Sequence, residues 1–340
     1  MVKFFAQTAL VLLLQIFLIQ TGAAATATWV QKSREGAAIS PGFPHRDTSR
    51  VVVYRGRVIL SGGYQYGGTA LQDLYWSGDG FRFNLALATT PYPVYTPLTV
   101  HDDKLFAVGS DKIRTSVNMT TWTAVATTQF ADSLIEASLV GDFNGRMFLF
   151  LDDKIRHTAD GVTWEVASVP WTGVLRNYSA IKHDGYIFVF GGSKPGADPM
   201  PELGYADRTS VNKVWRTDDP INGTWTEYDA PWAARLWPQG VSSGGNFYMV
   251  GGYNNMAATN HDGVWRCTTV MACERLTTTA LYLANPESAS KYIDPRLKPL
   301  SYSPRHWPAV FSLNGRVMMC AGNRNPDGPG TVNDCWELQD

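Results

Sequence analysis

The amino-acid sequence predicts an all-β fold built from repeated antiparallel sheets, and three observations support that prediction. Charged residues make up 17% of the 340 residues, below the roughly 25% that is usual for soluble domains. Glycine (31 residues) and aromatic residues (12%) are abundant, which suits short strands and tight turns better than amphipathic helices. One pattern of strand, tight turn and strand also recurs along the chain, and such a period indicates a repeat architecture.

The repeat is clearest in residues 234–253 and 303–323. Each copy carries an arginine near its start, followed by a strand, a Gly-Gly or Asn-Gly turn, and an apolar strand that ends in glycine. A further strand with a tryptophan follows each copy. Four earlier copies, in which the arginine and the glycines are less regular, begin near Val51, Pro97, Ser138 and Ser179.

The turns and the aromatic residues of the copies predict how the strands are arranged. The first two strands of each copy are joined by a short polar turn of the hairpin kind: Arg55-Gly56, Asp102-Asp103, Asn144-Gly145, Asp184-Gly185, Gly244-Gly245 and Asn314-Gly315. Each second strand is a continuous apolar run, as expected of a strand covered on both faces. Large aromatic residues recur where a fourth strand would start, at Phe83, Trp122, Trp164 and Trp225, where they would fill the space between stacked sheets. The prediction is a radial β-propeller of six four-stranded blades.

The last copy lacks its fourth strand, because only residues 337–340 follow Trp336. Residues 27–33 (ATWVQKS) are similar to the fourth strands of other copies. We therefore expect the N-terminal strand to complete the last blade and so close the ring, which would remove an exposed sheet edge. A seventh blade would need a degenerate copy within residues 276–302, but that segment holds no hairpin turn and no paired apolar strands.

This pattern resembles the kelch repeat, a β-propeller family of the galactose oxidase central-domain-like superfamily, over essentially the whole chain after residue 25. The second and third copies depart from it, because Ser110 and the pair Leu151-Asp152 stand where two glycines are expected. The turn from Thr158 to Trp164 also resembles a shortened Asp-box, a motif of other propellers. Both resemblances imply the same fold.

The N-terminus predicts export. Lys3 precedes an apolar run over residues 4–19, and small residues follow over residues 22–25. An uncleaved membrane anchor is the alternative, but a membrane-spanning helix needs about 20 apolar residues and this run is shorter. We expect a signal peptide over residues 1–25, a single domain over residues 26–340, and a secreted protein without stable membrane insertion after cleavage.

Four cysteines in an exported protein predict disulfides. Three pairings are possible, and the one that keeps each bridge local joins Cys267 to Cys273 and Cys320 to Cys335. A zinc site is the alternative, but the spacings match no zinc finger or ribbon. The acceptor motif for N-glycosylation occurs three times, at Asn118, Asn177 and Asn222.

The charge and the motifs exclude several classes of function. With 29 basic and 30 acidic residues the net charge is near −1, which argues against a nucleic-acid partner. No nucleotide-binding, esterase or metalloprotease motif occurs, and the six histidines are scattered. Asp198, Glu202 and Asp207 are candidate calcium ligands, although a solvated acidic loop explains them as well. We expect no cofactor, no metal, no catalytic residues and a monomer.

Strand direction predicts which face of the propeller binds a ligand. Long insertions, at residues 193–210, 254–262, 276–302 and 323–332, fall in connections that share one face. Loops presented by a rigid scaffold commonly carry function. The innermost strands start on this face, near Arg46, Arg176, Arg235 and Arg305, and Tyr178, Trp237 and Trp307 follow two residues after the last three arginines.

These arginines and aromatic residues predict an opening that holds a carboxylate or a sugar. Alternatively, the arginines bind backbone carbonyls and carboxylates around the channel, and a glycan at Asn177 would crowd the opening. We expect a non-catalytic binding module for a protein or glycan ligand. A sialidase-like hydrolase is the second hypothesis, with Glu136 and Tyr178 as its catalytic companions. It requires two carboxyl groups and a tyrosine to converge within about 6 Å.

Overall fold

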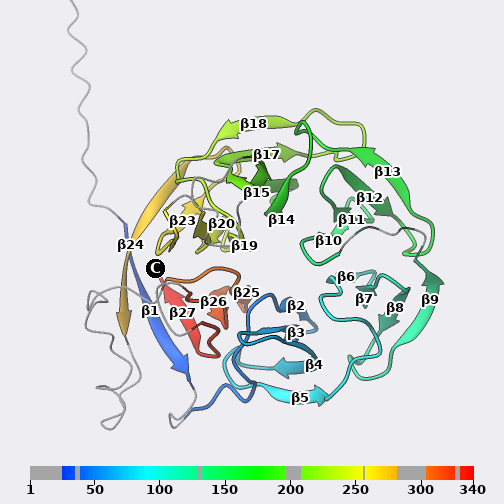
Figure 1. Cartoon of the computed structure of the whole chain (residues 1–340), viewed down its shortest axis with the longest axis horizontal. Coiled ribbons are helices and arrows are strands. Elements are labelled where there is room, and N and C mark those ends of the chain that lie inside the picture. The colour runs from blue at the N-terminus through cyan, green and yellow to red at the C-terminus, as the bar shows by residue number, and fades with distance from the viewer. Residues whose placement is uncertain are drawn as a thin grey trace, which may run out of the picture.

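The computed structural model describes residues 25–34, 39–128, 130, 132, 134–196, 208–255, 257–281, 304–325 and 330–340. These residues form strands β1 to β27 and no helix, and therefore no helix long and apolar enough to cross a membrane. Figure 1 shows their antiparallel sheets arranged around a common centre, as in a propeller. The all-β prediction is confirmed. The predicted signal peptide lies outside the described residues except for Ala25, as do Asp198, Glu202 and Asp207.

Three sheets have four strands each, which follow one another from the centre outward (Figure 1). The first holds β2 (Arg50–Tyr54), β3 (Arg57–Gln65), β4 (Thr69–Ser77) and β5 (Asn84–Leu87). The second holds β6 (Leu98–His101), β7 (Lys104–Val108), β8 (Lys112–Ser116) and β9 (Thr123–Thr127). The third holds β10 (Ser138–Phe143), β11 (Arg146–Phe150), β12 (Lys154–Thr158) and β13 (Glu165–Ser168).

The remaining strands form larger and smaller sheets. A five-stranded sheet holds β14 (Arg176–His183), β15 (Tyr186–Pro195), β17 (Lys213–Thr217) and β18 (Thr226–Asp229), with β16 (Arg208–Ser210) paired to β15. An eight-stranded sheet runs in the order β19 (Gln239–Ser243), β20 (Asn246–Val250), β23 (Val264–Cys267), β24 (Cys273–Leu281), β1 (Thr26–Ser33), β27 (Cys335–Gln339), β26 (Arg316–Cys320) and β25 (Ala309–Leu313). The short strands β21 (Tyr253–Asn254) and β22 (Thr259–Asn260) pair with each other.

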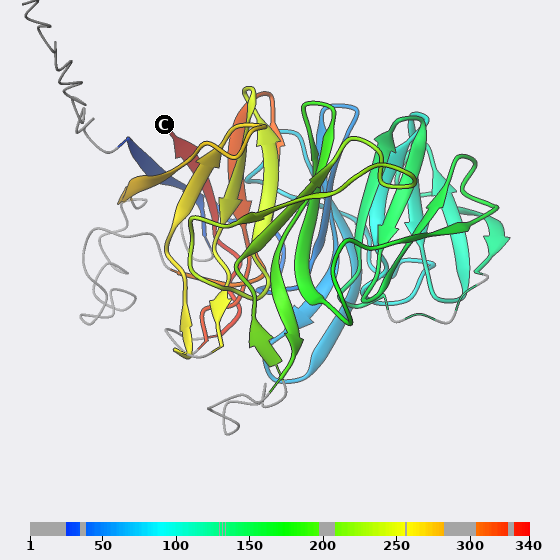
Figure 2. The ribbon, with the colours of Figure 1, turned by 90° about the horizontal axis from the view of Figure 1, so that it is seen from above.

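Strand β1 lies in the middle of the eight-stranded sheet. It pairs antiparallel with β27, where Gln31 lies opposite Trp336, and this is the pairing that the sequence predicts. It also pairs parallel with β24, from Thr26 opposite Thr277 to Val30 opposite Leu281. Figure 2 shows β1, β24 and β27 side by side in a second view.

The β1–β24 pairing corrects the predicted fold. Strand β24 pairs with β23 only as far as Leu276, and its continuation has backbone groups that β1 satisfies. The last two repeats therefore merge into one sheet. The prediction of six separate blades is wrong in its count. Among the described residues, four blade-like sheets stand apart, three with four strands and one with five.

The hydrophobic core lies between successive sheets. Trp164 is buried in a cluster with Phe106 of the preceding sheet, and Phe83 packs with Phe311 of the eight-stranded sheet. Trp122 and Trp225 pack at the margins of corresponding clusters. The innermost strands also contact one another in the order β2, β6, β10, β14, β19 and β25, and β25 contacts β2. The prediction that recurrent aromatic residues fill the space between sheets is confirmed.

Both predicted disulfides are present. Cys267–Cys273 closes the turn between β23 and β24, and Cys320–Cys335 joins the neighbouring strands β26 and β27. The turns between the third and fourth strands of the four preceding repeats are closed by side chains instead. In one of them, Thr158 Oγ1 accepts hydrogen bonds from two backbone N–H groups, and Asp160 accepts two more. These backbone hydrogen bonds lower the pKa of Asp160.

Candidate functional site

Two of the predicted arginines are buried within ion pairs. Arg46 and Arg305 are each 0% exposed. Arg46 donates to both carboxylate oxygens of Asp73, at 2.6 and 2.9 Å, and Arg305 donates to Asp334 at 2.6 Å. Burial alone would raise the pKa of Asp334, but the charge and hydrogen bond of Arg305 outweigh it and lower that pKa. Both guanidinium groups are thus engaged inside their own sheets.

Arg235 occupies the same place and binds backbone carbonyls. It is 2% exposed, and its guanidinium donates to the carbonyls of Ala233 and Gly251 at 3.0 and 2.8 Å. Glycine is required beside it, because a Cβ atom on Gly252, where φ is +103°, would lie 3.0 Å from the Arg235 side chain. Arg46, Arg235 and Arg305 therefore bind carbonyls or carboxylates of the protein itself, as in the alternative stated above.

The backbone of each buried arginine also joins it to the preceding repeat. A glycine N–H donates to the arginine carbonyl at about the same length in each case: Gly192 to Arg235 at 2.8 Å, Gly252 to Arg305 at 3.1 Å, and Gly322 to Arg46 at 2.8 Å. The last of these bonds connects the C-terminal repeat to the first one.

Arg176 and Tyr178 do not share this arrangement. Arg176 is exposed, forms an ion pair with Asp152 at 2.7 Å, and lies opposite Ser193, one position away from the register of the buried arginines. Leu175 fills the buried position. Tyr178 is 5% exposed and donates to the Leu151 carbonyl at 2.9 Å, and its burial raises its pKa well above the usual value. Tyr178 therefore belongs to the core between the sheets.

Trp237 and Trp307 lie side by side. Their rings stack with centroids 5.1 Å apart and planes 13° from parallel. Both residues have left-handed backbone, with φ of +50° and +52°, which is rare for bulky side chains and costs of order 1–3 kcal/mol. Thr48 and Tyr95 have the same conformation, with φ of +55° and +61°. Such strain persists only where the surrounding structure enforces it, and it is often found at ligand sites.

A cavity of about 430 Å³ lies beside the two tryptophans. Its volume falls within the range of about 300–1,000 Å³ that is typical of small-molecule sites. Most of the lining side chains are uncharged, and many are aromatic. They come from five of the six repeats: Asp47, Thr48, Tyr64, Tyr66, Tyr95, Ile135, Trp237, Tyr253, His306, Trp307, Asn323 and Asn325. The cavity therefore lies across the centre of the ring, at the starts of innermost strands, on the face that the insertions predict. We refer to it as the central cavity.

The charge of the central cavity differs from the prediction. Asp47 is 5% exposed and accepts hydrogen bonds from Thr48 Oγ1 and Asn323 Nδ2, both at 2.7 Å. Burial raises its pKa and these hydrogen bonds partly oppose the rise. His306 shares a hydrogen bond with Asn260 at 2.6 Å, and burial lowers its pKa to about 3, so it is neutral at pH 7. No lysine or arginine is among the described lining residues.

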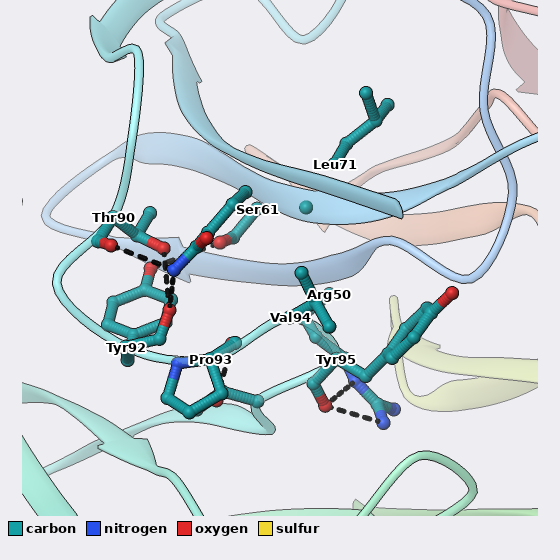
Figure 3. A pocket seen from close by; sticks show the side chains of 11 residues that line it. Arg50, Ser61, Leu71, Thr90, Tyr92, Pro93, Val94 and Tyr95 are labelled. Carbon is teal, nitrogen blue, oxygen red and sulfur yellow. Dashed lines mark hydrogen bonds between the residues drawn. The ribbon is translucent and has the colours of Figure 1, made fainter. Parts of the chain in front are cut away.

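Arg50 binds the backbone of Tyr95 and Ile135, two residues that line the central cavity, but does not line it itself. Its guanidinium donates only to carbonyls, those of Tyr95, Leu134, Ile135 and Ala137, at 2.9 to 3.3 Å. Burial lowers its pKa to about 10, so it stays protonated at pH 7. Figure 3 shows Arg50 and Tyr95 beside a second cavity of about 10 Å³. That volume is at the lower limit for one water molecule, so this second cavity is no ligand site.

Several lining residues were not predicted, although the repeat contains a signal for them. In the three repeats with a buried arginine, the residue after the arginine bridges to the residue after the pair of small residues that follows the second strand. These bridges are Asp47–Tyr64, Leu236–Tyr253 and His306–Asn323. Five of these six side chains line the central cavity. Aligning the copies at these two positions would have identified them.

The structure also bears on the glycosylation and hydrolase hypotheses. Asn177 is 1% exposed, and its oxygen accepts hydrogen bonds from Ser193 and Arg208, so the folded chain leaves no room for a glycan there. Asn118 and Asn222 are exposed in turns between third and fourth strands.

The hydrolase hypothesis needs a free Glu136, but Glu136 pairs with Arg208 at 3.1 Å. No cluster of potential metal ligands occurs within the described part of the chain.

The central cavity thus combines a stacked pair of indoles, further aromatic rings and one buried carboxylate. Asp47 is the one carboxylate among the lining residues that the structure describes. In comparisons with known proteins, no family model matches this chain and no curated protein matches it.

Proposed function

We propose that the chain is a secreted, non-catalytic kelch-type propeller with six repeats that binds a glycan in the central cavity. The six repeats are supported by the successive contacts of the innermost strands, with the eight-stranded sheet holding two of them. Closure by the N-terminal strand is supported by the pairing of β1 with β27. The kelch resemblance is supported by the buried arginine that recurs at Arg46, Arg235 and Arg305, each with its backbone carbonyl bound by a glycine N–H of the preceding repeat.

The stacked pair Trp237 and Trp307 carries the proposal. Flat aromatic faces complement the C–H face of a pyranose ring, and they bury much area with little loss of side-chain freedom. The pair borders a cavity of suitable size, about 430 Å³. Asn323 and Asn325 at its wall provide amide groups of the kind that bind sugar hydroxyls.

The charges favour binding over hydrolysis. Hydrolysis of a glycosidic bond commonly uses two carboxyl groups that face the substrate. Asp47 alone is of this kind among the described lining residues, while Glu136 is paired with Arg208 and Tyr178 is buried in the core.

The test is a glycan-array screen followed by calorimetry, with wild type, Trp307→Ala and Trp76→Ala. Trp76 lies on β4 and outside the central cavity, so its variant controls for loss of an indole in general. We expect Trp307→Ala to weaken binding at least about tenfold, which corresponds to about 1.4 kcal/mol, and Trp76→Ala to bind as wild type does. Absence of binding to every glycan on the array, or equal binding by all three proteins, would refute the proposal. Binding to a protein alone would replace the glycan with a protein ligand.

A further inference from the structure

The sign of the charge in the central cavity indicates what kind of ligand it accepts. Asp47 is the one acidic residue among the described lining residues, and the one histidine, His306, is neutral because it is buried. The remaining lining residues are aromatic, amide, hydroxyl or aliphatic side chains. An anionic ligand would therefore bring a second negative charge to the cavity and meet no cation on its described wall.

Within the described part of the chain, the carboxylate of Asp47 has neutral hydrogen-bond donors and no ionic partner. Its donors are Thr48 and Asn323. The adjacent Arg46 directs its guanidinium to Asp73, and Arg50 donates to carbonyls only. No described lysine, arginine or histidine forms an ion pair with Asp47. Buried charges in proteins are normally paired, so this carboxylate is suited to a cation that the ligand supplies.

The aromatic lining favours the same charge. Tyr64, Tyr66 and Tyr95 share the cavity with Trp237 and Trp307. The faces of such rings carry partial negative charge and attract ammonium groups within about 6 Å, most strongly when water is excluded. Tyr64 and Asp47 also form a backbone bridge, which places the two residues opposite each other at the wall of the cavity.

We propose that the ligand is a glycan with free amino groups, an amino sugar that is not N-acetylated, whose ammonium group pairs with Asp47. The sugar ring then packs on the outer face of Trp307, whose other face stacks on Trp237. This proposal rests on the proposed glycan-binding function and specifies its ligand class. The proposed ligand is positively charged, whereas the arginines in the sequence suggested a ligand with a negatively charged carboxylate.

The experiment is calorimetric titration of the full secreted chain with three oligosaccharides of equal length: oligo-glucosamine, oligo-N-acetylglucosamine and oligogalacturonate. We expect wild type to bind the glucosamine oligomer at least tenfold more tightly than the acetylated one, and the uronate most weakly. Asp47→Asn removes the charge but keeps an acceptor for Thr48, so its preference for the free amine should fall to near unity. Asp102→Asn, the same change in an exposed turn outside the cavity, should bind as wild type does.

The outcomes separate this proposal from the one on which it rests. Equal wild-type affinity for the glucosamine and acetylated oligomers overturns the amine proposal and leaves glycan binding intact, and so does an unchanged preference in Asp47→Asn. Binding to array glycans but to none of the three oligomers also overturns the amine proposal and leaves glycan binding intact. If wild type binds no glycan at all, the proposed function itself fails. The comparison of ligands on wild type needs no variant, so it holds even if Asp47→Asn does not fold.

Discussion

The β10–β13 sheet and the eight-stranded sheet are built from the same repeat but are stabilised by different chemistry. In the first, Leu134 and Leu151 fill places that an arginine and a glycine hold elsewhere, and the outer turn is closed by Thr158 and Asp160. The eight-stranded sheet contains both disulfides, and Arg235 and Arg305 lie buried at the starts of its two repeats.

This difference in chemistry concerns the part of the ring that holds the two tryptophans. Backbone bonds from Gly192 and Gly252 hold the carbonyls of Arg235 and Arg305, two residues before the strained tryptophans. The side of the ring that presents the indoles therefore contains both disulfides and the ion pair of the buried Arg305 with Asp334. The β10–β13 sheet contributes only Ile135 to the cavity, from the loop before it, and relies mainly on apolar packing.

The largest expected effect tests the buried ion pair. Arg305→Met should destabilise the protein by about 3–5 kcal/mol, because the carboxylate of Asp334, whose side chain is 16% exposed, would lose the buried cation that donates to it. Lys154→Met in β12 removes a partly exposed ion pair with Asp132 and should cost only about 0.2–1 kcal/mol. Urea unfolding gives both values. Similar losses in the two variants would show that the sheets are not stabilised differently.

The next largest losses of stability are expected on removal of the disulfides. The bridge Cys320–Cys335 spans 15 residues and Cys267–Cys273 spans 6. Chain entropy predicts losses of about 3 and about 2 kcal/mol when each pair is changed to alanine. Thermal unfolding of the two double variants under oxidising conditions measures the order. A larger loss for the shorter loop would mean that native packing, and not the unfolded chain, sets the contribution.

The smallest expected effect concerns the side-chain cap in the β10–β13 sheet. Asp160→Ala should cost about 1 kcal/mol, because the N–H groups of Val162 and Thr163 lose their acceptor. Asp160→Asn should be nearly neutral, since Asn118 makes the same bonds in the turn between β8 and β9. Equal destabilisation by both changes, in the same unfolding assay, would show that the charge matters more than the hydrogen bonds.

The sequence allowed accurate prediction of features with local signals. Hairpin turns such as Asn314-Gly315, the apolar second strands and the local cysteine pairs each depend on residues close together in the chain. The β1–β24 pairing could not be predicted in this way, because parallel pairing of distant strands follows no turn rule.

The candidate site was predicted less well than the fold. The face and the two tryptophans follow from strand direction and repeat position. The burial of Arg46, Arg235 and Arg305 depends on partners such as Asp73, whose position relative to the arginine appears only after folding. Arg176 was misplaced because a shift of one residue changes the side of the strand on which a side chain lies.

The position of β1 between β24 and β27 has a consequence for biosynthesis. The ribosome makes this strand long before either neighbour, so its edges stay unpaired until β24 and β27 have been made. An interrupted chain that lacks β27 would retain an open edge suited to aggregation or chaperone capture. Pairing with β27 therefore removes the open edge that β1 presents in the partly made sheet.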